Sequence, residues 1–399
     1  MDVLAGGGIA SAKGFRAGAV ASGIKKTGAL DLVLVVSDTP ATAAGVFTQN
    51  KVRAAPVILS EQAVRRASVR GAIVNSGNAN CCTGEQGLAD AREMAGLAAR
   101  KIGATPDELI VASTGVIGVH LPMDRVRAGI PAIDPAGDGG PAAARGIMTT
   151  DTFPKEHAET VEIDGRVITV GGMAKGSGMI HPNMATMLAF VSTDAALDPA
   201  FLRMAVRTAA DASFNMISVD GDTSTNDTFV VLANGAAGNS PIVAETPAAT
   251  VFQAALNTVA IDLARAIARD GEGATKLIDV SVEGAASVAD ARIAARGIIS
   301  SSLFKAAVYG ADPNWGRILC ALGYSGAAVD PDRADILIGD VCLMRNGKIQ
   351  EFDRDAAVAR MVGPDVFVRA HLHLGSGSAR AWGCDLTEKY VDINGRYTT

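Results

Sequence analysis

The chain has 399 residues and a formal net charge of −6, with 48% hydrophobic but only 4% aromatic residues. A large core must therefore be built from small aliphatic side chains, as in close-packed α/β proteins. The absence of a basic run or a basic-aromatic stripe argues against nucleic-acid binding. No signal peptide or membrane-spanning stretch is evident, so we expect a soluble cytoplasmic protein without a membrane partner.

Apolar runs of strand length alternate along the chain with segments of helical periodicity, and this alternation predicts an α/β fold. Strands are expected, in chain order, at residues 32–36, 72–74, 109–111, 188–191, 229–232, 278–282, 336–343 and 366–374. Helices are expected at residues 88–102, 252–267 and 285–299, where small apolar residues recur at helical spacing.

Three further predictions concern turns and boundaries. Asp164-Gly165 separates two short apolar-alternating stretches, which is typical of a hairpin closed by a type I′ turn. Residues 130–144 are rich in Pro, Gly and Ala, which predicts a surface linker. The composition shifts mildly near Ala285, where a smaller C-terminal domain is expected to begin.

The five cysteines and five histidines show no pattern typical of a disulfide framework or a metal site. The adjacent Cys81 and Cys82 form no C-x-x-C pair, and the other cysteines are scattered. His371 and His373 alternate on an expected strand and so face one side, but no third ligand is evident. We therefore predict neither a bound metal nor a cofactor.

The most informative segment runs from Lys175 to Leu188, where a glycine-rich loop leads through Ala185-Thr186 into an apolar strand. A Thr hydroxyl is a weak nucleophile, but the α-amino group of an N-terminal Thr titrates near neutral pH and serves as its base. Cleavage between Ala185 and Thr186 would therefore create a catalyst. The local pattern also suits a threonine that simply opens a strand.

Seven other segments are polar and glycine-rich, namely residues 75–84, 112–118, 148–155, 218–228, 270–276, 310–317 and 393–399. Backbone N–H groups at 112–118, directly after a strand, suit either an oxyanion hole or an ordinary turn. Residues 148–155 set hydroxyls and a carboxylate beside a lysine, which fits a solvated loop or a contact with a polar substrate. The acidic run 218–228 lacks the glutamate and spacing of an EF-hand. Glu272, between glycines, is either a loop residue or a carboxylate aimed into a site.

Together these segments resemble the ornithine acetyltransferase family, also called the bifunctional glutamate N-acetyltransferases of arginine biosynthesis. Four motifs carry the resemblance, which spans essentially the whole chain: T-T-D-T-F-P-K at 149–155, N-M-A-T-M-L at 183–188, D-G-D-T-S-T-N-D-T at 220–228 and A-D-P-N-W-G-R at 311–317. The implied fold is a layered α-β-β-α sandwich of the self-cleaving N-terminal-nucleophile type, with a smaller C-terminal α/β domain. The tail departs from many relatives, which carry Ala-Asp in place of Gly395-Arg396, but the spacing of Asn394 and Thr399 is kept.

The resemblance implies a role for each matching position. Thr186 is the nucleophile, released by cleavage after Ala185. Thr114 and Gly115 form the oxyanion hole, through the threonine hydroxyl and a backbone N–H. The substrate-contacting positions are Thr152, Lys175, Thr186, Glu272, Asn394 and Thr399.

The implied reaction is acetyl transfer from N2-acetyl-L-ornithine to L-glutamate by a ping-pong mechanism through an acetyl-threonine ester, in the cyclic pathway of arginine biosynthesis. The resemblance further implies that the mature enzyme is a heterotetramer of two α chains, residues 1–185, and two β chains, residues 186–399. Within the β chain, residues 186–284 complete the sandwich and residues 285–399 form the C-terminal domain.

Three questions stay open at the level of the sequence. It does not decide whether acetyl-CoA is a second acetyl donor. A self-cleaving aminopeptidase or amidohydrolase of similar fold, in which water replaces glutamate, is the alternative enzyme. A binding protein for acetylated amino acids, with an inert Thr186, is the non-enzymatic alternative.

Overall fold

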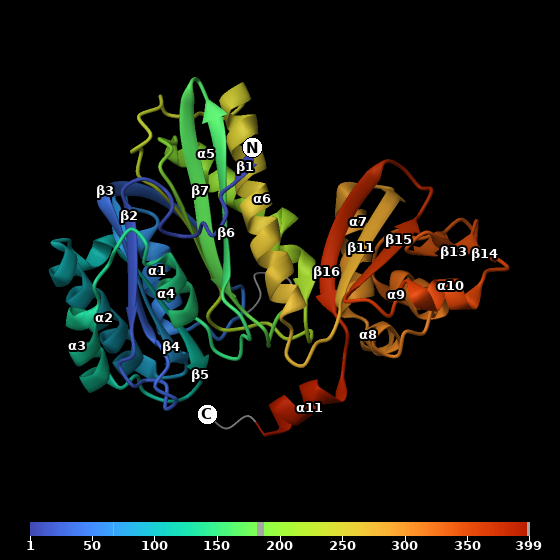
Figure 1. Ribbon diagram of the computed structural model, residues 1–399, viewed down its shortest axis with the longest axis horizontal. Helices are drawn as coiled ribbons and strands as arrows, with labels where there is room; N and C mark the ends of the chain where they lie inside the picture. Colours follow the sequence, from blue (N-terminus) through green and yellow to red (C-terminus); the bar gives the residue numbers. More distant parts are fainter. Residues whose placement is uncertain (67, 182–186, 397–399) are drawn as a thin grey trace.

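The chain folds into two lobes, each built on its own β-sheet (Figure 1). The computed structural model describes residues 1–66, 68–181 and 187–396. In the larger lobe, two sheet layers lie between two layers of helices. The smaller lobe is a mixed sheet with helices packed against it. The predicted layered α-β-β-α sandwich with a smaller C-terminal α/β unit is therefore confirmed.

One long strand, β3 (Leu32–Phe47), belongs to both sheet layers of the sandwich. Its first half pairs with β2 (Phe15–Val20) and β4 (Val69–Asn78), and β5 (Leu109–Val116) extends that layer. The second layer continues from the other half of β3 through β10 (Thr228–Ala233), β8 (Leu188–Thr193), β7 (Arg166–Lys175), β6 (Lys155–Ile163) and β1 (Asp2–Val3). Because all these strands belong to one hydrogen-bonded sheet, the ends of β5, β7 and β8 are fixed relative to one another.

The apolar run that begins β3 is continuous because both of its faces are buried. Leu32 and Leu34 point toward the helices α2 (Gly84–Ile102) and α3 (Met123–Ala132), whereas Val33 points between the two sheets. This is the two-residue alternation of a strand buried on both sides. On the opposite outer face, α5 (Pro199–Ala212) and α6 (Pro247–Arg269) cover the second layer. Of two shorter helices, α1 (Ala55–Ala63) packs against β5 and α2, and α4 (Gly140–Gly146) packs against β2 and β3.

The smaller lobe draws its strands from distant parts of the chain. Its sheet has the order β14 (Lys348–Ile349), β13 (Val341–Arg345), β12 (Asp335–Ile338), β15 (Asp365–His371), β11 (Leu277–Ala285), β16 (Gly377–Cys384) and β9 (Ile217–Ser218). The remaining helices are α7 (Val288–Ser300), α8 (Ser302–Tyr309), α9 (Trp315–Tyr324), α10 (Arg354–Ala359) and α11 (Glu388–Gly395), and short 3-10 turns are η1 (Pro106–Glu108) and η2 (Phe214–Met216). Helix α7 packs on β11 and β16. The expected division at 284/285 falls at the end of β11, and the division of the chain into domains stays a prediction.

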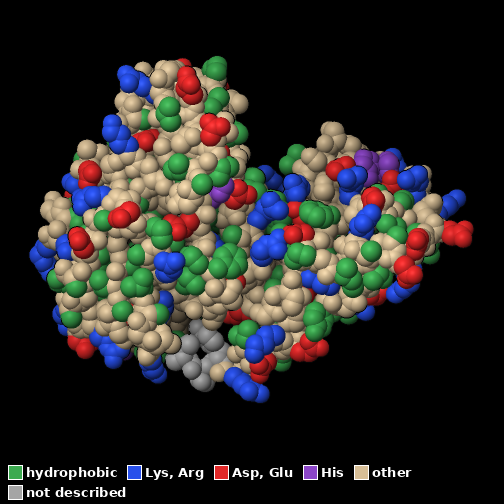
Figure 2. Space-filling view, in the orientation of Figure 1, with side chains coloured by type: hydrophobic (Ala, Val, Ile, Leu, Met, Phe, Trp, Pro, Cys, Tyr) green, Lys and Arg blue, Asp and Glu red, His purple; other side chains and the backbone are tan. Residues whose placement is uncertain are grey.

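A cleft of about 520 Å³ separates the lobes, between α6 and the β11–β16 part of the smaller sheet. Figure 2 shows the two lobes parting on this face, with charged side chains of both signs around the notch. Among the described residues, α6 alone is long and apolar enough to cross a membrane, judged by length and composition only. Half of its most apolar window is buried, and residues such as Phe252 and Val259 belong to the core, which accounts for its apolarity.

Most expected strands and helices are present, and two expectations are wrong. Residues 336–343 form a hairpin of β12 and β13 rather than one strand, because Gly339 turns the chain with a φ of +58°. Residues 130–144 are not one continuous surface linker, since α3 and α4 occupy both ends, where Ile130 and Ala143 are fully buried, and the exposed or partly exposed connection between the two helices is limited to residues 134–139. Small residues there allow close packing, which composition alone does not separate from loop character. The hairpin at Asp164-Gly165 has both central residues at positive φ, as a type I′ turn requires.

Candidate active site

A small polar cavity lies where β5, the end of β7 and the C-terminal helix α11 approach one another. Its volume is about 140 Å³. It is lined by Thr114, Gly115, Ile117, Thr149, Thr150, Lys175, Gly178, Met179, Ser224, Thr225, Asn226, Glu272 and Asn394. Segments as far apart in the sequence as Thr114 and Asn394 thus converge on one site. Of the predicted site residues, the cavity brings together Thr114, Gly115, Lys175, Glu272 and Asn394.

The Thr114-Gly115 turn at the end of β5 needs glycine at its second position. Gly115 has a φ of +137°, and a Cβ there would overlap the backbone of Gly77 on the neighbouring strand. The Ser113 hydroxyl donates to Asn75 Oδ1 at 2.6 Å, and the Asn226 amide donates to the Ser113 carbonyl at 2.8 Å. These bonds fix the turn from both sides. The asparagine-rich segment 75–84 therefore supports the turn and does not itself line the cavity.

Lys175, the last residue of β7, is a buried cation facing the cavity. Its side chain is almost fully buried, and Nζ lies 3.8 Å from Asp151 Oδ2. Burial lowers the pKa of the Lys175 ammonium group, and the negative charge of Asp151 acts in the opposite direction. A buried cation beside a cavity is suited to bind a carboxylate that enters from solvent.

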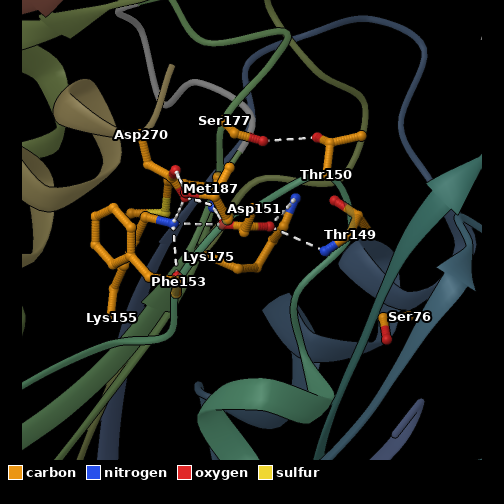
Figure 3. A network of polar contacts seen from close by, with 12 residues as sticks. Ser76, Thr149, Thr150, Asp151, Phe153, Lys155, Lys175, Ser177, Met187 and Asp270 are labelled. Carbon is orange, nitrogen blue, oxygen red and sulfur yellow. Dashed lines mark hydrogen bonds and ion pairs between the residues drawn. The ribbon is translucent and has the colours of Figure 1, made fainter. Parts of the chain in front are cut away.

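A buried ionic network lies directly behind Lys175 (Figure 3). Lys155 Nζ donates to Asp151 Oδ1 at 2.7 Å and to Asp270 Oδ2 at 2.6 Å. Asp151 also accepts the N–H of Gly176 at 2.6 Å, which fixes the start of the glycine-rich loop. Burial alone would raise the pKa of Asp151, but Lys175 and Lys155 together hold it well below its usual range.

Thr152, a predicted substrate contact, lies in this network and is not among the residues that line the cavity. Its backbone N–H donates to Asp270 Oδ2 at 2.9 Å, and its hydroxyl donates to Oδ1 of the same carboxylate. Asp270 follows the last residue of α6, a helix that begins after Thr246, whose side chain caps it by accepting the Ala249 N–H. Thr152 thus ties the loop 149–155 to the end of α6.

Glu272 is held over the glycine-rich loop by contacts from three segments. Its N–H donates to the Ser177 carbonyl at 2.8 Å, and Asn394 Nδ2 donates to its Oε2 at 2.8 Å. A Cβ on Gly178 would overlap the Glu272 carboxylate, so the carboxylate lies directly on this glycine. The Thr150 and Ser177 hydroxyls, 2.6 Å apart, complete the same wall. The structure therefore places Glu272 as a carboxylate at the cavity.

Two aspartates of the 220–228 motif, whose roles the sequence did not assign, flank the proposed cleavage segment. Asp220 accepts the N–H groups of Met179 and Ile180, at 2.5 and 2.9 Å. Asp227 is fully buried, and its Oδ1 accepts the Met187 N–H at 3.0 Å. Burial raises the pKa of Asp227 well above its usual range. The signal that could have found them is the density of Asp, Ser and Thr in a segment that ends in a buried strand.

Three predicted site residues, Ala185, Thr186 and Thr399, lie outside the described residues. The first described residue after Thr186 is Met187, which is buried and bonded to Asp227.

The layered sandwich, together with a polar cavity holding a buried lysine, a carboxylate and a Thr-Gly turn, defines an α/β protein with the architecture of an enzyme. The model of the ArgJ family matches residues 16–399. The chain therefore belongs to the ArgJ family, which confirms the resemblance drawn from the motifs.

Curated relatives match the chain over its whole length. The "Arginine biosynthesis bifunctional protein ArgJ" of Symbiobacterium thermophilum is 56% identical over 403 residues, covering 100% of both chains. The protein of the same name from Dehalococcoides mccartyi is 49% identical over 401 residues, covering 100% of this chain and 99% of its own. Among solved structures, the crystal structure of the arginine biosynthesis bifunctional protein argJ from Bacillus halodurans is 47% identical, with a TM-score of 0.51. That match covers 52% of this chain and 98% of the solved chain.

Proposed function

We propose that this chain is a glutamate N-acetyltransferase of arginine biosynthesis, which moves the acetyl group of N2-acetyl-L-ornithine to L-glutamate. The observation that carries the proposal is the cavity, in which the Thr114-Gly115 turn, Lys175 and Glu272 meet beside the segment that follows Thr186. These groups supply what acyl transfer between amino acids needs: donors for an oxyanion, a cation for a carboxylate and a carboxylate for an amine.

The nucleophile is proposed to arise by self-cleavage. Thr186 Oγ attacks the Ala185 carbonyl carbon, the peptide shifts to an ester, and water hydrolyses the ester to leave chains 1–185 and 186–399. Asp220 anchors the backbone before this segment and Asp227 anchors it afterwards, which supports a fixed site of cleavage. The solved relative from Bacillus halodurans, a chain that aligns with about half of this one, is consistent with a family whose members exist as two chains.

In turnover, the free α-amino group of Thr186 takes the hydroxyl proton as Oγ attacks the acetyl carbonyl of N2-acetylornithine. The Thr114 hydroxyl and the Gly115 N–H stabilise the oxyanion, and loss of one such donor typically costs about 3 kcal/mol in the barrier. Ornithine leaves with the proton, and glutamate then attacks the acetyl-threonine ester. The order of release and binding makes the kinetics ping-pong.

The remaining side chains are proposed to bind the two amino acids. Lys175 pairs with the α-carboxylate, and Glu272, held by Asn394, receives the substrate amine. Thr152 does not contact the substrate itself but bonds Asp270, and this bond fixes the loop 149–155 beside the cavity. Thr399 is proposed to close the site from the C-terminus.

The finer features are proposals of the same kind. The mature enzyme is a cytoplasmic heterotetramer of two α and two β chains. Residues 186–284 complete the sandwich, apart from β9 and β11, whose sheet they share with the C-terminal domain 285–399. The relatives are named bifunctional. We propose acetyl-CoA as the second acetyl donor, since its thioester would give the same acetyl-threonine intermediate.

Intact-mass spectrometry under denaturing conditions tests the proposal on wild type and Thr186→Ala. We expect two fragments split between Ala185 and Thr186 in wild type, one intact chain in the variant, and glutamate-dependent loss of acetyl from N2-acetylornithine in wild type only. A Thr186→Ala variant that is still cut and still active would show that Thr186 is not the nucleophile. Release of ornithine at a rate independent of glutamate would favour the aminopeptidase or amidohydrolase alternative instead.

A further inference from the structure

A further hollow lies on the outside of the sandwich and shares no lining residue with the cavity described above. Its volume is about 430 Å³, and it is lined by Ala44, Gly45, Phe47, Glu61, Val64, Arg65, Arg203 and Arg207. Its floor is the end of β3, where residues 44–47 pair with β10 along one edge only. Its walls are the C-terminal end of α1 and the middle of α5. We call this hollow the arginine groove.

The arginine groove concentrates positive charge on a protein whose net charge is −6. Arg203 and Arg207 are one helical turn apart on α5, so their side chains share a face, and Arg65 approaches from the opposite wall. Within the described part of the chain, none of these three guanidinium groups is in an ion pair. The carboxylate in the lining, Glu61, is already paired with Arg53 at 2.5 Å. The planar fork of an arginine side chain matches the geometry of phosphate as well as carboxylate groups and binds either through two parallel hydrogen bonds.

The groove lies close to the catalytic cavity. Phe47 in its floor is paired with Thr228, and Thr228 is paired with Leu188 on the next strand. Two strand spacings separate Phe47 from Leu188, or about 10 Å, and Leu188 is two residues beyond Thr186.

The loop 48–53 joins the groove to the rim of the cavity. Asn50 Nδ2 donates to the Thr223 carbonyl at 3.0 Å, and the Thr48 hydroxyl donates to the carbonyl of Ser224, a cavity residue, at 2.6 Å. The far side of the same loop carries Arg53, the partner of Glu61 in the groove. A ligand lying in the groove therefore needs to pass only this loop to reach the cavity.

The size of the catalytic cavity limits what it can hold. At about 140 Å³ it suits an acetylated amino acid, whereas drug-sized ligands occupy roughly 300–1,000 Å³. A CoA thioester must therefore place its nucleotide outside the cavity. Its pantetheine arm, comparable in length to about four extended residues, spans roughly 13 Å, which covers the separation between groove and cavity.

We propose that the arginine groove binds the 3′-phosphorylated adenosine diphosphate part of acetyl-CoA, so that the pantetheine arm crosses the loop 48–53 and presents the acetyl group to Thr186. Arg65, Arg203 and Arg207 bind the phosphates, and Phe47 and Val64 offer apolar surface to the adenine. Thr186 Oγ then bonds to the acetyl carbon, the carbon–sulfur bond breaks, and the hydroxyl proton passes through the α-amino group to the departing thiolate. This inference rests on the proposed acetyltransferase function.

The two acetyl donors allow an internally controlled test, because N2-acetylornithine does not reach the groove. In the double variant Arg203→Ala/Arg207→Ala we expect the KM for acetyl-CoA to rise about tenfold or more, since one hydrogen bond to a charged group is worth about tenfold or more in affinity. The kcat/KM for N2-acetylornithine should stay within about twofold. Both arginines are exposed, so folding should be unaffected. Arg345→Ala, which removes an exposed arginine from β13 in the smaller lobe, is the matched control and should change neither value.

A fragment of the cofactor separates the two sites directly. The probe 3′-phosphoadenosine 5′-diphosphate, which lacks the pantetheine arm, should compete with acetyl-CoA and leave acetyl transfer from N2-acetylornithine unchanged. The same nucleotide without its 3′-phosphate should compete more weakly. Equal inhibition with both donors, or none with acetyl-CoA, overturns the inference.

The outcomes for the inference and for the proposed function are distinguishable. If transfer from N2-acetylornithine to glutamate proceeds but acetyl-CoA is not used, or is used equally well by the double variant, the arginine groove is not a CoA site and the proposed function stands. If wild type transfers acetyl from neither donor, the proposed function itself fails.

Discussion

Asp227 is a single buried carboxylate that fixes the backbone directly after the proposed nucleophile. It is fully buried, and its Oδ1 accepts the N–H of Met187 at 3.0 Å. Because burial raises its folded-state pKa, the folded protein binds a proton more tightly here than the unfolded chain does. The free energy of unfolding therefore falls as the pH rises from the unfolded value of about 3.9 toward the raised folded value.

The substitution Asp227→Asn should remove this pH dependence, since it keeps an oxygen acceptor for Met187 and cannot ionise. Urea unfolding across pH values of about 4 to 8 should give a flatter stability profile for the variant than for wild type. In contrast, Asp227→Ala leaves the buried N–H of Met187 unsatisfied and should be about 1–3 kcal/mol less stable than Asp227→Asn at every pH. Identical pH profiles for wild type and Asp227→Asn would show that this carboxylate does not titrate differently in the folded state.

Gly178 offers a test of where the Glu272 carboxylate must lie. Its backbone is not at positive φ, so alanine is conformationally allowed, but the added Cβ would overlap the Glu272 carboxylate. Since the end of a side chain moves more easily than a backbone, we expect Gly178→Ala to fold and to displace the carboxylate. The expected result is a kcat/KM for N2-acetylornithine reduced about tenfold to a hundredfold, because such misplacement of a positioned group is costly in catalysis.

The control for this substitution is Gly137→Ala, where a Cβ meets no atom within 4 Å. It should leave both stability and turnover unchanged. Full activity in Gly178→Ala would mean that the observed position of Glu272 is not needed for binding the substrate amine.

Among whole elements, α11 links the C-terminus to the site without belonging to the core. None of its residues is buried, yet Asn394 bonds Glu272, and Thr387 at its start donates to the Gly273 carbonyl at 2.8 Å. Tyr390 is half-buried, and burial, followed by the nearby charges of Asp220, Asp222 and Glu272, raises the pKa of its phenol. The helix thus contributes contacts to the cavity and little apolar burial.

We therefore expect removal of residues 388–399 to abolish acetyl transfer while the melting temperature falls by no more than a few degrees. Calorimetry and the N2-acetylornithine assay on the same preparation check both parts. A truncated protein that retains activity would remove Asn394 and Thr399 from the substrate site. One that fails to fold would contradict the exposed, peripheral character of α11.

The elements also show where sequence reasoning succeeds and where it stops. Strands such as 32–36 are predictable because both faces are buried and the apolar run is unbroken. The segment 130–144 is not, because Ala and Gly are as common in tight packing as in loops, and only the neighbouring sheet decides. In the site, motif matching locates five of the residues that line the cavity. The network behind them also needs the contact between Lys155 and Asp270, which are 115 positions apart in the sequence.

At the scale of the molecule, the proposed cleavage site lies within a sheet that both products would share. The layer order is β7, β8, β10 and β3, so the two strands that follow residue 186 lie between two strands that precede it. Six residue pairs join β7 to β8 and six join β10 to β3. Helix α6, which also follows the cleavage site, packs on β6 and β7. Separation of the products would expose this entire apolar face.

Cleaved wild-type protein should therefore elute as one species in native size-exclusion chromatography, at the volume of the uncut Thr186→Ala variant. Cleavage changes one property that can be measured, since unfolding of two associated chains releases two molecules where the uncut chain releases one. The melting temperature of wild type should therefore rise with protein concentration. That of Thr186→Ala should rise less, because only the assembly of larger complexes, which both proteins share, makes it depend on concentration. Separate elution of the 1–185 and 186–399 chains without denaturant would contradict the shared sheet. If it were found, the β7–β8 and β3–β10 ladders would have to be too weak to hold the products once the backbone between them is cut.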